Sequence, residues 1–399
     1  MLTVAEATRK ILPFARFLKG TESLPLADAC GRILALDVIA GVDVPPHDNS
    51  AMDGYAVRSA DLANSMVLPM GEEIFAGDAP AVLSAHTAMR IFTGAPIPQG
   101  ADAVVIQEDT DSNGESVIVN VPVSAGDNIR RQGEDIQRGQ LLFQRGHLLR
   151  AQDIGLLASV GIAFVEVFER LRVGLFCTGD ELQEPGELLA PGKIYNSNRY
   201  LLSALLRDMG CDILDAGRVP DELSATEAAM ASLAASADIV ISTGGVSVGD
   251  ADYVKAAVLA LGDLNVWKIA IKPGKPLAFG CVAGKPFFGL PGNPVSAFVT
   301  FLLFVRPYLQ IEQGSEPKTL RTLRAIAGFD WPKPGKREEY LRVQLHPDSH
   351  GHLQAVTYPN QGSGVLSSIC WADALLRVPA GDTFARGEPV ECLLLDRIV

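Results

Sequence analysis

Residues 238–252 constrain the fold most, because they join a buried strand pattern to a helix start through a glycine turn. The β-branched run at 239–241 is typical of a strand that is buried on both faces of a parallel sheet. Ligands bind at the carboxyl ends of such strands, and glycines there let the backbone approach a phosphate beside a helix N-terminus. The candidate phosphate-binding glycines are Gly244, Gly245 and Gly249.

Carboxylates lie next to this turn and after two other predicted strands. Asp250 and Asp252 follow the glycines, and Glu181 and Asp221 follow two earlier strands. In a parallel sheet Glu181, Asp221 and Asp252 would converge on one edge, where a hard cation such as Mg²⁺ relieves their repulsion and bridges phosphate oxygens. The alternative is an ordinary glycine turn in which Asp252 only caps the next helix.

A second group of residues carries the opposite charge. Lys272 and Lys275 lie in a Lys-Pro-Gly-Lys-Pro segment whose prolines fix the backbone, and Lys268 precedes Lys272 on the same side of a strand. Asn293 and Pro294 fit the N-cap and the first position of a helix, which offers a second helix N-terminus to an anion. These residues predict an anion-binding region beside the acidic edge, with exposed loop lysines as the alternative.

Composition excludes some classes of partner. The 399 residues exceed what one core usually supports, so we expect two to four domains. The net charge of -13 argues against a general nucleic-acid or anionic-membrane surface. The six cysteines lack metal-ligand spacing, which predicts free thiols, no zinc site and a cytoplasmic location. Prolines interrupt the uncharged stretch 287–305, so we expect a buried strand and helix there and no membrane span.

The order of helix and strand patterns along the chain predicts an α/β multidomain fold. Thr3 and Glu6 have capping-box spacing, so a helix is expected near the N-terminus. Short runs broken by glycine and proline predict a β-rich segment at 58–138. Alternating strands and helices predict an α/β segment that ends near residue 311, and short β runs predict an all-β segment at 318–399.

Several loops carry further candidate groups. Asp53 follows a Pro-Pro loop and is placed to present a carboxylate, whereas Thr93 either binds a ligand or only forms a turn. Asp135 follows paired arginines in a pattern that favours a solvated ion-pair face. The notable groups of the C-terminal segment, all predicted to lie at the surface, are Arg337, Arg342 and the loop 361–364.

Taken together, these motifs resemble the molybdopterin molybdenumtransferase family, which includes MoeA and the E domain of gephyrin. The motifs that follow the family's order over nearly the full length are DNSAMDGYA (48–56), TGAP (93–96), GED (133–135), TGDEL (178–182), GGVSVG (244–249), KPGKP (272–276) and PGNPVS (291–296). No single motif suffices, but their shared order makes the resemblance specific. Asn196 and Glu222 depart from the family pattern, in which Asp is common, and both keep oxygen ligands.

The resemblance implies four domains and a homodimer with the site between subunits. An elongated connector domain would comprise residues 1–25 and 139–170 with parts of 26–57. A β-rich insertion domain would comprise residues 58–138. A Rossmann-like molybdopterin-binding domain of the MoaB/MogA type would comprise residues 171–315, and a C-terminal β-barrel would comprise residues 318–399.

The resemblance also implies an activity: Mg²⁺-dependent insertion of molybdate into adenylated molybdopterin, with release of AMP. The implied catalytic residues, some of which would act across the dimer interface, are Asp53, Thr93, Asp135, Glu181, Asp221, Lys268, Lys272 and Lys275. The implied metal ligands are Glu181, Asp221 and Asp252. The implied binding residues for the pterin nucleotide and the anion are Gly244, Gly245, Ser247, Gly249, Pro291, Asn293, Pro294, Ser296, Arg337 and Ser363.

Two other functions stay open at this point. One is molybdopterin adenylyltransferase or nucleotide pyrophosphatase activity on a related fold, which the flanking segments and the 48–56 motif disfavour. The other is a non-enzymatic scaffold, which the absence of a disordered partner-binding linker disfavours. Docking with a separate molybdopterin adenylyltransferase is a further expectation from the resemblance.

Overall fold

The computed structural model describes all residues except 18, 246–252, 275 and 396–399. Of the predicted site residues, Ser247, Gly249, Asp252 and Lys275 therefore lie outside the described residues. The chain forms two compact units. Unit 1 comprises residues 1–22, 31–35 and 167–399, and unit 2 comprises residues 23–30 and 36–166. The boundaries predicted above for four domains remain a prediction.

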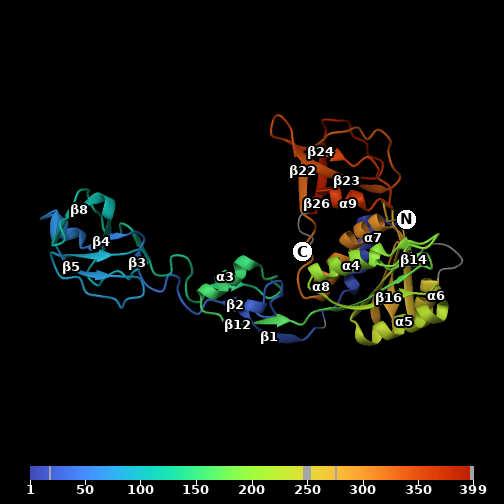
Figure 1. Cartoon of the computed structure of the whole chain (residues 1–399), viewed down its shortest axis with the longest axis horizontal. Helices are drawn as coiled ribbons and strands as arrows, with labels where there is room; N and C mark the ends of the chain where they lie inside the picture. Colours follow the sequence, from blue (N-terminus) through green and yellow to red (C-terminus); the bar gives the residue numbers. More distant parts are fainter. Residues whose placement is uncertain (18, 246–252, 275, 396–399) are drawn as a thin grey trace. The chain divides into compact units, whose positions relative to one another are not determined.

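A mixed sheet forms the centre of unit 1 (Figure 1). Its strands, in spatial order, are β16 (Asp212–Val219), β13 (Arg172–Thr178), β17 (Ile239–Thr243), β21 (Lys285–Leu290), β20 (Pro276–Val282) and β18 (Gly262–Lys268). The first four are parallel, as the buried β-branched runs predict, and β20 is antiparallel to both of its neighbours. The sequence interpretation missed β20. The apolar run of this strand follows the Pro-Gly loop directly, and no further turn signal marks where the strand begins.

Helices cover both faces of this sheet, which explains why its inner strands β13, β17 and β21 are buried at nearly every position. Helices α5 (Leu223–Ser236) and α6 (Tyr253–Leu261) cover one face (Figure 1). Helices α4 (Ser197–Asp208), α7 (Pro294–Thr300) and α8 (Arg306–Glu312) cover the other face. Adjacent residues of a strand consequently pack into different cores, as Leu175 and Phe176 do.

The helical run Pro294–Glu312 is the core helix that the sequence predicts, although it extends beyond the predicted end. It includes a π-helical turn at Phe301–Val305 between α7 and α8. By length and composition alone it could cross a membrane, but most of it is buried inside unit 1. Its apolar surface is therefore explained by packing against the sheet.

The N-terminal helix α1 (Val4–Ile11) confirms the predicted capping box. The Thr3 hydroxyl accepts a hydrogen bond from the Glu6 amide (3.2 Å), and the Glu6 carboxylate accepts one from the Thr3 amide (2.8 Å). Such reciprocal caps satisfy the free amides of the first turn. Ala7 and Ile11 then pack into the same core as helix α4.

The C-terminal part of unit 1 is a closed β-barrel, as predicted. Its strands are β22 (Thr322–Ala327), β23 (Glu338–Pro347), β24 (Leu353–Thr357), β25 (Ala374–Val378) and β26 (Pro389–Leu394). The barrel closes because β23 pairs with both β24 and β25. The short strand β19 (Ile271–Lys272) pairs in parallel with the start of β23, and helix α9 (Ser367–Trp371) packs against β23.

Unit 2 contains a β-sheet in the segment that was predicted to be β-rich. Its strands, in spatial order, are β7 (Ala103–Ile106), β4 (Gly54–Val57), β6 (Ala88–Ile91), β5 (Val67–Ile74), β9 (Ser116–Val119) and β8 (Thr110–Ser112). Apolar side chains of β4 alternate between two cores, with Tyr55 and Val57 in one and Ala56 in the other. The helices of unit 2 are α2 (Ser59–Leu62) and α3 (Ala151–Ser159).

The remaining strands are short. They are β1 (Thr21–Pro25), β2 (Val38–Ile39), β3 (Asn49–Ser50), β10 (Ile129–Arg130), β11 (Leu141–Phe143), β12 (Phe164–Phe168), β14 (Leu182–Gln183) and β15 (Ile194–Tyr195). Within unit 2, β3 pairs with β10 and β2 pairs with β11. Within unit 1, β14 pairs with β15.

Gly54 is required where β4 lies against β7. A Cβ at this position would overlap the carbonyl oxygen of Val105, whereas a Cβ on Gly71 in β5 would meet the Ala88 carbonyl at an ordinary 3.5 Å. We predict that Gly54→Ala destabilises unit 2 by about 3 kcal/mol, because the two backbones must separate. Hydrogen–deuterium exchange of the β4 and β7 peptides would measure the loss, with Gly71→Ala as the matched control.

Candidate functional site

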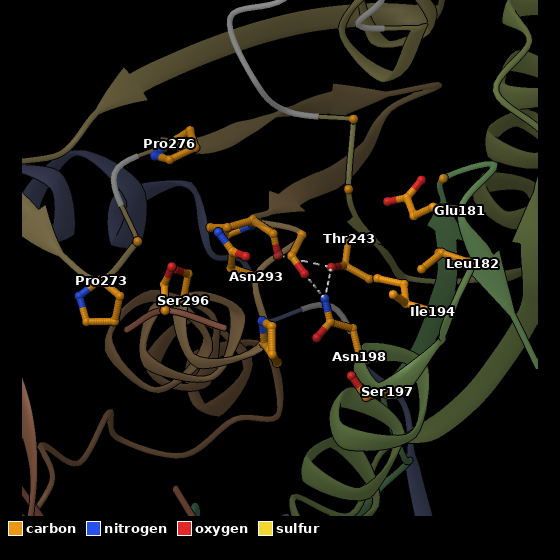
Figure 2. A pocket seen from close by; sticks show the side chains of 18 of the residues that line it. Glu181, Leu182, Ile194, Ser197, Asn198, Thr243, Pro273, Pro276, Asn293 and Ser296 are labelled. Atoms are coloured by element: carbon orange, nitrogen blue, oxygen red, sulfur yellow. Dashed lines mark hydrogen bonds between the residues drawn. The ribbon is translucent and has the colours of Figure 1, made fainter. Parts of the chain in front are cut away.

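A cleft of about 750 Å³ opens in unit 1 at the carboxyl ends of the parallel strands. The loops after β13, β17 and β21 form its floor, and the start of α7 forms one wall. The barrel contributes Arg337 and the loop 361–363, and β19 contributes Lys272. Figure 2 shows side chains from several separate segments around this space, among them Glu181, Thr243 and Asn293. This is the place where open α/β sheets bind ligands.

The cleft brings together many of the residues singled out from the sequence. Those that line it are Glu181, Asp221, Gly244, Gly245, Lys272, Pro291, Asn293, Pro294, Ser296, Arg337 and Ser363. Lys268 is exposed on β18 and does not line the cleft. Asp53, Thr93 and Asp135 belong to unit 2 and are described separately below.

The acidic side of the cleft contains Asp221 and Glu181. The Asp221 carboxylate accepts a hydrogen bond from the Asp180 amide (3.1 Å). Burial raises the pKa of Asp221 above its usual value, and the negative charges of Asp180 and Glu181 add to the rise. Within the described residues no three metal-binding side chains lie together. The predicted set with Asp252 lies partly outside that range, so the predicted metal site remains a prediction.

The basic side of the cleft is attached to the barrel. Lys272 lies in β19, and its ammonium group forms an ion pair with the Glu339 carboxylate (3.0 Å), which is 8% exposed. Arg337 donates a hydrogen bond from Nη1 to the Ile271 carbonyl (3.2 Å), directly before Lys272. The Lys272 side chain itself is 45% exposed, so it stays accessible to an anion while Glu339 fixes its position.

A polar network that the sequence interpretation missed links the strand ends. The Asn198 amide donates from Nδ2 to the Thr243 hydroxyl (2.8 Å) and to the Gly292 carbonyl (2.7 Å), as Figure 2 shows. The Thr243 hydroxyl in turn donates to the Pro291 carbonyl (3.1 Å). These bonds hold the Gly-Gly turn after β17 and the Pro-Gly turn after β21 in one arrangement. Only the residue type of Asn198, at a helix start, gave a signal, and its partners are distant in sequence.

Some buried polar atoms beside this network have no hydrogen-bond partner among the described residues. Among the described residues, Oδ1 of Asn198 and Oγ1 of Thr178 are buried and have no hydrogen-bond partner. Gly244 and Gly245 lie directly against Thr178, where a Cβ on either residue would clash with it. The wall is thus polar and closely packed, with capacity for further hydrogen bonds.

Arg342 corrects the prediction of a surface group in the C-terminal segment. Its side chain is 1% exposed, and it donates to the Ser368 hydroxyl (3.0 Å), the Tyr340 carbonyl (3.1 Å) and the Gly362 carbonyl (3.2 Å). Burial lowers the pKa of Arg342 to about 10. An arginine is normally exposed, so the prediction failed because this one supports the loop that reaches the cleft.

The start of α7 is only partly as predicted. Asn293 occupies the N-cap and Pro294 the first helical position, but the Asn293 side chain makes no capping hydrogen bond. The Val295 amide instead donates to the Ser363 carbonyl of the barrel loop (3.1 Å). One of the free amides of this helix start is therefore already used by the protein, and less of the N-terminus is open to an anion than expected.

In unit 2, Asp53 and Thr93 form a tight pair. The Thr93 amide and hydroxyl both donate to Oδ1 of Asp53, at 2.7 and 2.8 Å. These two hydrogen bonds lower the pKa of Asp53, with the Thr93 amide as the larger cause. Asp135 is exposed in a loop where its amide donates to the Val44 carbonyl (3.0 Å). Arg131, four residues earlier, forms an ion pair with Asp48 (2.6 Å).

The fold and the cleft define a multidomain α/β protein that gathers carboxylates and cations at the end of a parallel sheet. Three family models match the chain: the MoeA N-terminal region (domains I and II) at residues 2–161, a probable molybdopterin binding domain at 174–311, and the MoeA C-terminal region (domain IV) at 324–395. The chain belongs to the molybdopterin molybdenumtransferase family.

Similar proteins support this assignment over nearly the full length. A molybdopterin molybdenumtransferase of Haemophilus influenzae is 40% identical over 394 residues, covering 96% of this chain and 97% of the relative. One from Bacillus subtilis is 35% identical over 406 residues, covering 99% of this chain and 94% of the relative. The solved structure of the molybdopterin biosynthesis protein moeA from Pyrococcus horikoshii has a TM-score of 0.83 at 32% identity, covering 99% of this chain and all of that one.

The raised pKa of Asp221 leads to a prediction on stability. An acid whose pKa is higher in the folded chain destabilises the fold while it is ionised, and the penalty fades as the pH falls toward the ordinary aspartate value of about 3.9. We therefore expect Asp221→Asn, without divalent cations, to raise the Tm at pH 7.5 by about 1 °C.

Differential scanning calorimetry at pH 7.5 and at pH 5 would measure this gain and its decrease with pH. Asp382→Asn, a change in an exposed loop of the barrel, is the matched control and should leave the Tm unchanged. A lower Tm for Asp221→Asn at pH 7.5 would show that the carboxylate stabilises the fold, contrary to its raised pKa.

Proposed function

We propose that this chain acts in molybdenum cofactor biosynthesis by inserting molybdate into adenylated molybdopterin, with release of AMP. The named activity of its relatives supports the proposal. The observation that carries it is the presence of opposite charges in one cleft: Asp221 and Glu181 on one side, and Lys272 and Arg337 on the other. Molybdate is a dianion and the phosphoanhydride of the nucleotide is also anionic, so a site for both needs cations that carboxylates position.

The proposed role of the protein is electrostatic positioning. Lys272 and Arg337 would attract the anions, and the Gly244–Gly245 turn would let backbone amides approach the phosphate. Asn198 and Arg342 would keep the two turns and the barrel loop in place through the hydrogen bonds described above. None of these roles requires a covalent intermediate, and none of the motifs pairs a serine or cysteine with a histidine as an activated nucleophile would need.

Mg²⁺ fits the acidic side by its chemistry. Asp221 and Glu181 would hold it, because their carboxylates are hard oxygen ligands. Burial raises the pKa of Asp221, the charges of Asp180 and Glu181 add to the rise, and a bound cation would offset this repulsion. When bound, Mg²⁺ would neutralise charge on the phosphate oxygens and on the departing AMP. Asp252 is proposed as a further ligand on the sequence pattern and the resemblance, since it lies outside the described residues.

Other assignments remain proposals with less support. Asp53, Thr93 and Asp135 are proposed to act from unit 2, and the Asp53–Thr93 pair supports this because its hydrogen bonds favour an ionised carboxylate. The sequence patterns and the resemblance together support Lys268, Lys275 and Gly249, and the resemblance alone supports Ser247. The resemblance also supports a homodimer and docking with a molybdopterin adenylyltransferase, whereas the cysteine usage supports a cytoplasmic location.

The direct test is to mix the purified full chain with adenylated molybdopterin, molybdate and Mg²⁺, and to follow AMP by chromatography. We expect AMP release that depends on molybdate and stops when Mg²⁺ is chelated. Formation of adenylated molybdopterin from ATP and molybdopterin would instead identify an adenylyltransferase. Absence of both reactions, with the protein folded, would favour the scaffold alternative.

A second prediction concerns the effect of Lys272 on the KM for molybdate. Lys272→Gln removes the cation that Glu339 positions in the cleft, so we expect the KM for molybdate to rise about tenfold, consistent with the loss of one charged hydrogen bond. Lys333→Gln, a change at an exposed lysine of unit 1 outside the cleft, is the matched control. An equal KM for wild type and Lys272→Gln would exclude Lys272 from anion binding.

A further inference from the structure

Four side chains of unit 2 form a ladder in the order Phe75, Phe92, Arg90 and Tyr55. The Phe75 and Phe92 rings are stacked, with centroids 4.6 Å apart and planes within 8° of parallel. The Arg90 guanidinium lies over the Phe92 ring and over the Tyr55 ring, 5.0 Å from each centroid. Tyr55 is buried, whereas Phe75 at the other end is 48% exposed. The ladder therefore runs from the core of unit 2 to solvent.

The strand register places this ladder at one edge of the sheet. Ile74 pairs with Ile91 in the parallel strands β5 and β6, so the next residues, Phe75 and Phe92, are neighbours. Gly54 of the antiparallel strand β4 also pairs with Ile91, which brings the preceding residue, Asp53, to the same edge. The Asp53–Thr93 pair thus lies beside Phe92, and Phe75 lies on the other side of Phe92 at the same edge.

Hydrogen bonds fix the inner part of the ladder. Arg90 donates from Nη2 to the Gln107 side-chain oxygen (2.6 Å) and from Nη1 to the Gly54 carbonyl (3.3 Å). The Phe75 amide donates to the Asp78 carboxylate (2.7 Å), which closes the turn that carries this ring. The turn thereby holds the half-exposed Phe75 ring in place, although the packing of unit 2 does not require a ring at this position.

We propose that Phe75 and Phe92 form a stacking platform for a planar nitrogen heterocycle that carries an exocyclic amino group, with Asp53 accepting a hydrogen bond from that group. Both heterocycles of adenylated molybdopterin, adenine and the pterin, have this chemistry. The inference rests on the proposed function and deepens it, because it assigns part of substrate recognition to unit 2. It makes Phe75 a binding residue, and Phe92, which lies between Phe75 and Arg90, the ring that supports it.

The chemistry of the platform fits such a ring. Every nucleobase has a π face, so stacking on an aromatic side chain binds heterocycles without requiring a particular hydrogen-bond pattern. The Arg90 guanidinium holds the Phe92 ring from behind through a cation–π contact. Specificity for an amino group comes from Asp53. Both donors of Thr93 use Oδ1, and no described residue donates to Oδ2, which leaves an acceptor at the same edge.

The main experiment measures AMP release by the full chain as a function of adenylated molybdopterin concentration. We expect Phe75→Leu to raise the KM for adenylated molybdopterin about tenfold while kcat stays within about twofold, because stacking is lost and the charged groups remain. Phe75→Tyr keeps the aromatic face and should restore the KM. Phe164→Leu, at another exposed phenylalanine of unit 2, is the matched control.

A binding arm distinguishes the two heterocycles and does not depend on turnover. Isothermal titration calorimetry of the full chain with AMP alone, and with neopterin as a pterin without a nucleotide, should show weaker binding to Phe75→Leu for one of the two. That compound identifies the stacked ring. If the wild type releases no AMP, the proposed function fails, but a loss of AMP or neopterin binding in Phe75→Leu still supports the platform.

Two results would overturn the platform. The first is a Phe75→Leu variant with the same KM for adenylated molybdopterin as Phe164→Leu. In that result the two variants would also bind AMP and neopterin equally well, or would both fail to bind them. The second is a Phe75→Leu variant that changes the sedimentation coefficient of the chain without changing either affinity, since the ring would then belong to a protein interface.

Discussion

The in-register parallel pairing of β16, β13, β17 and β21 is the constraint from which the cleft follows. Val219 pairs with Thr178, Cys177 with Thr243, and Thr243 with Leu290, so these strands end at one edge. Helices cover both faces of the sheet, which leaves this edge as the place where polar groups can meet a ligand. The residues that come directly after these strands form the acidic side, the glycine turn and the Pro-Gly turn of the cleft.

The parts that could be predicted from the sequence are those with a local physical cause. The β-branched runs predicted the parallel strands because burial on both faces requires apolar residues throughout. The capping box at Thr3 and Glu6 and the position of Pro294 were predictable for the same reason, since each depends on neighbours within one helical turn. The gathering of Glu181 and Asp221 followed from the topology of parallel strands alone.

The parts that could not be predicted depend on partners far away in the chain. Asn198 joins Thr243 and Gly292, and Arg342 supports a loop twenty residues further on, so neither has a signature in its own neighbourhood. The stacking of Phe75 and Phe92 likewise requires the register of two strands that are distant in sequence. Lys268 illustrates the converse: its position relative to Lys272 placed it on the same side of a strand, but the chain turns into a different sheet between the two lysines.

The pairing of β19 with β23 has a mechanical consequence. Lys272 is anchored to the barrel by this short strand and by Glu339, while Asp221 and the glycine turn are anchored to the α/β sheet. The distance between the positive and negative walls of the cleft therefore depends on how the barrel packs against the α/β sheet within unit 1. A small tilt of the barrel would move the Lys272 ammonium group and the Arg337 guanidinium group together. The spacing of the charges in the cleft can therefore be changed by substitutions that lie between the barrel and the sheet, remote from any ligand.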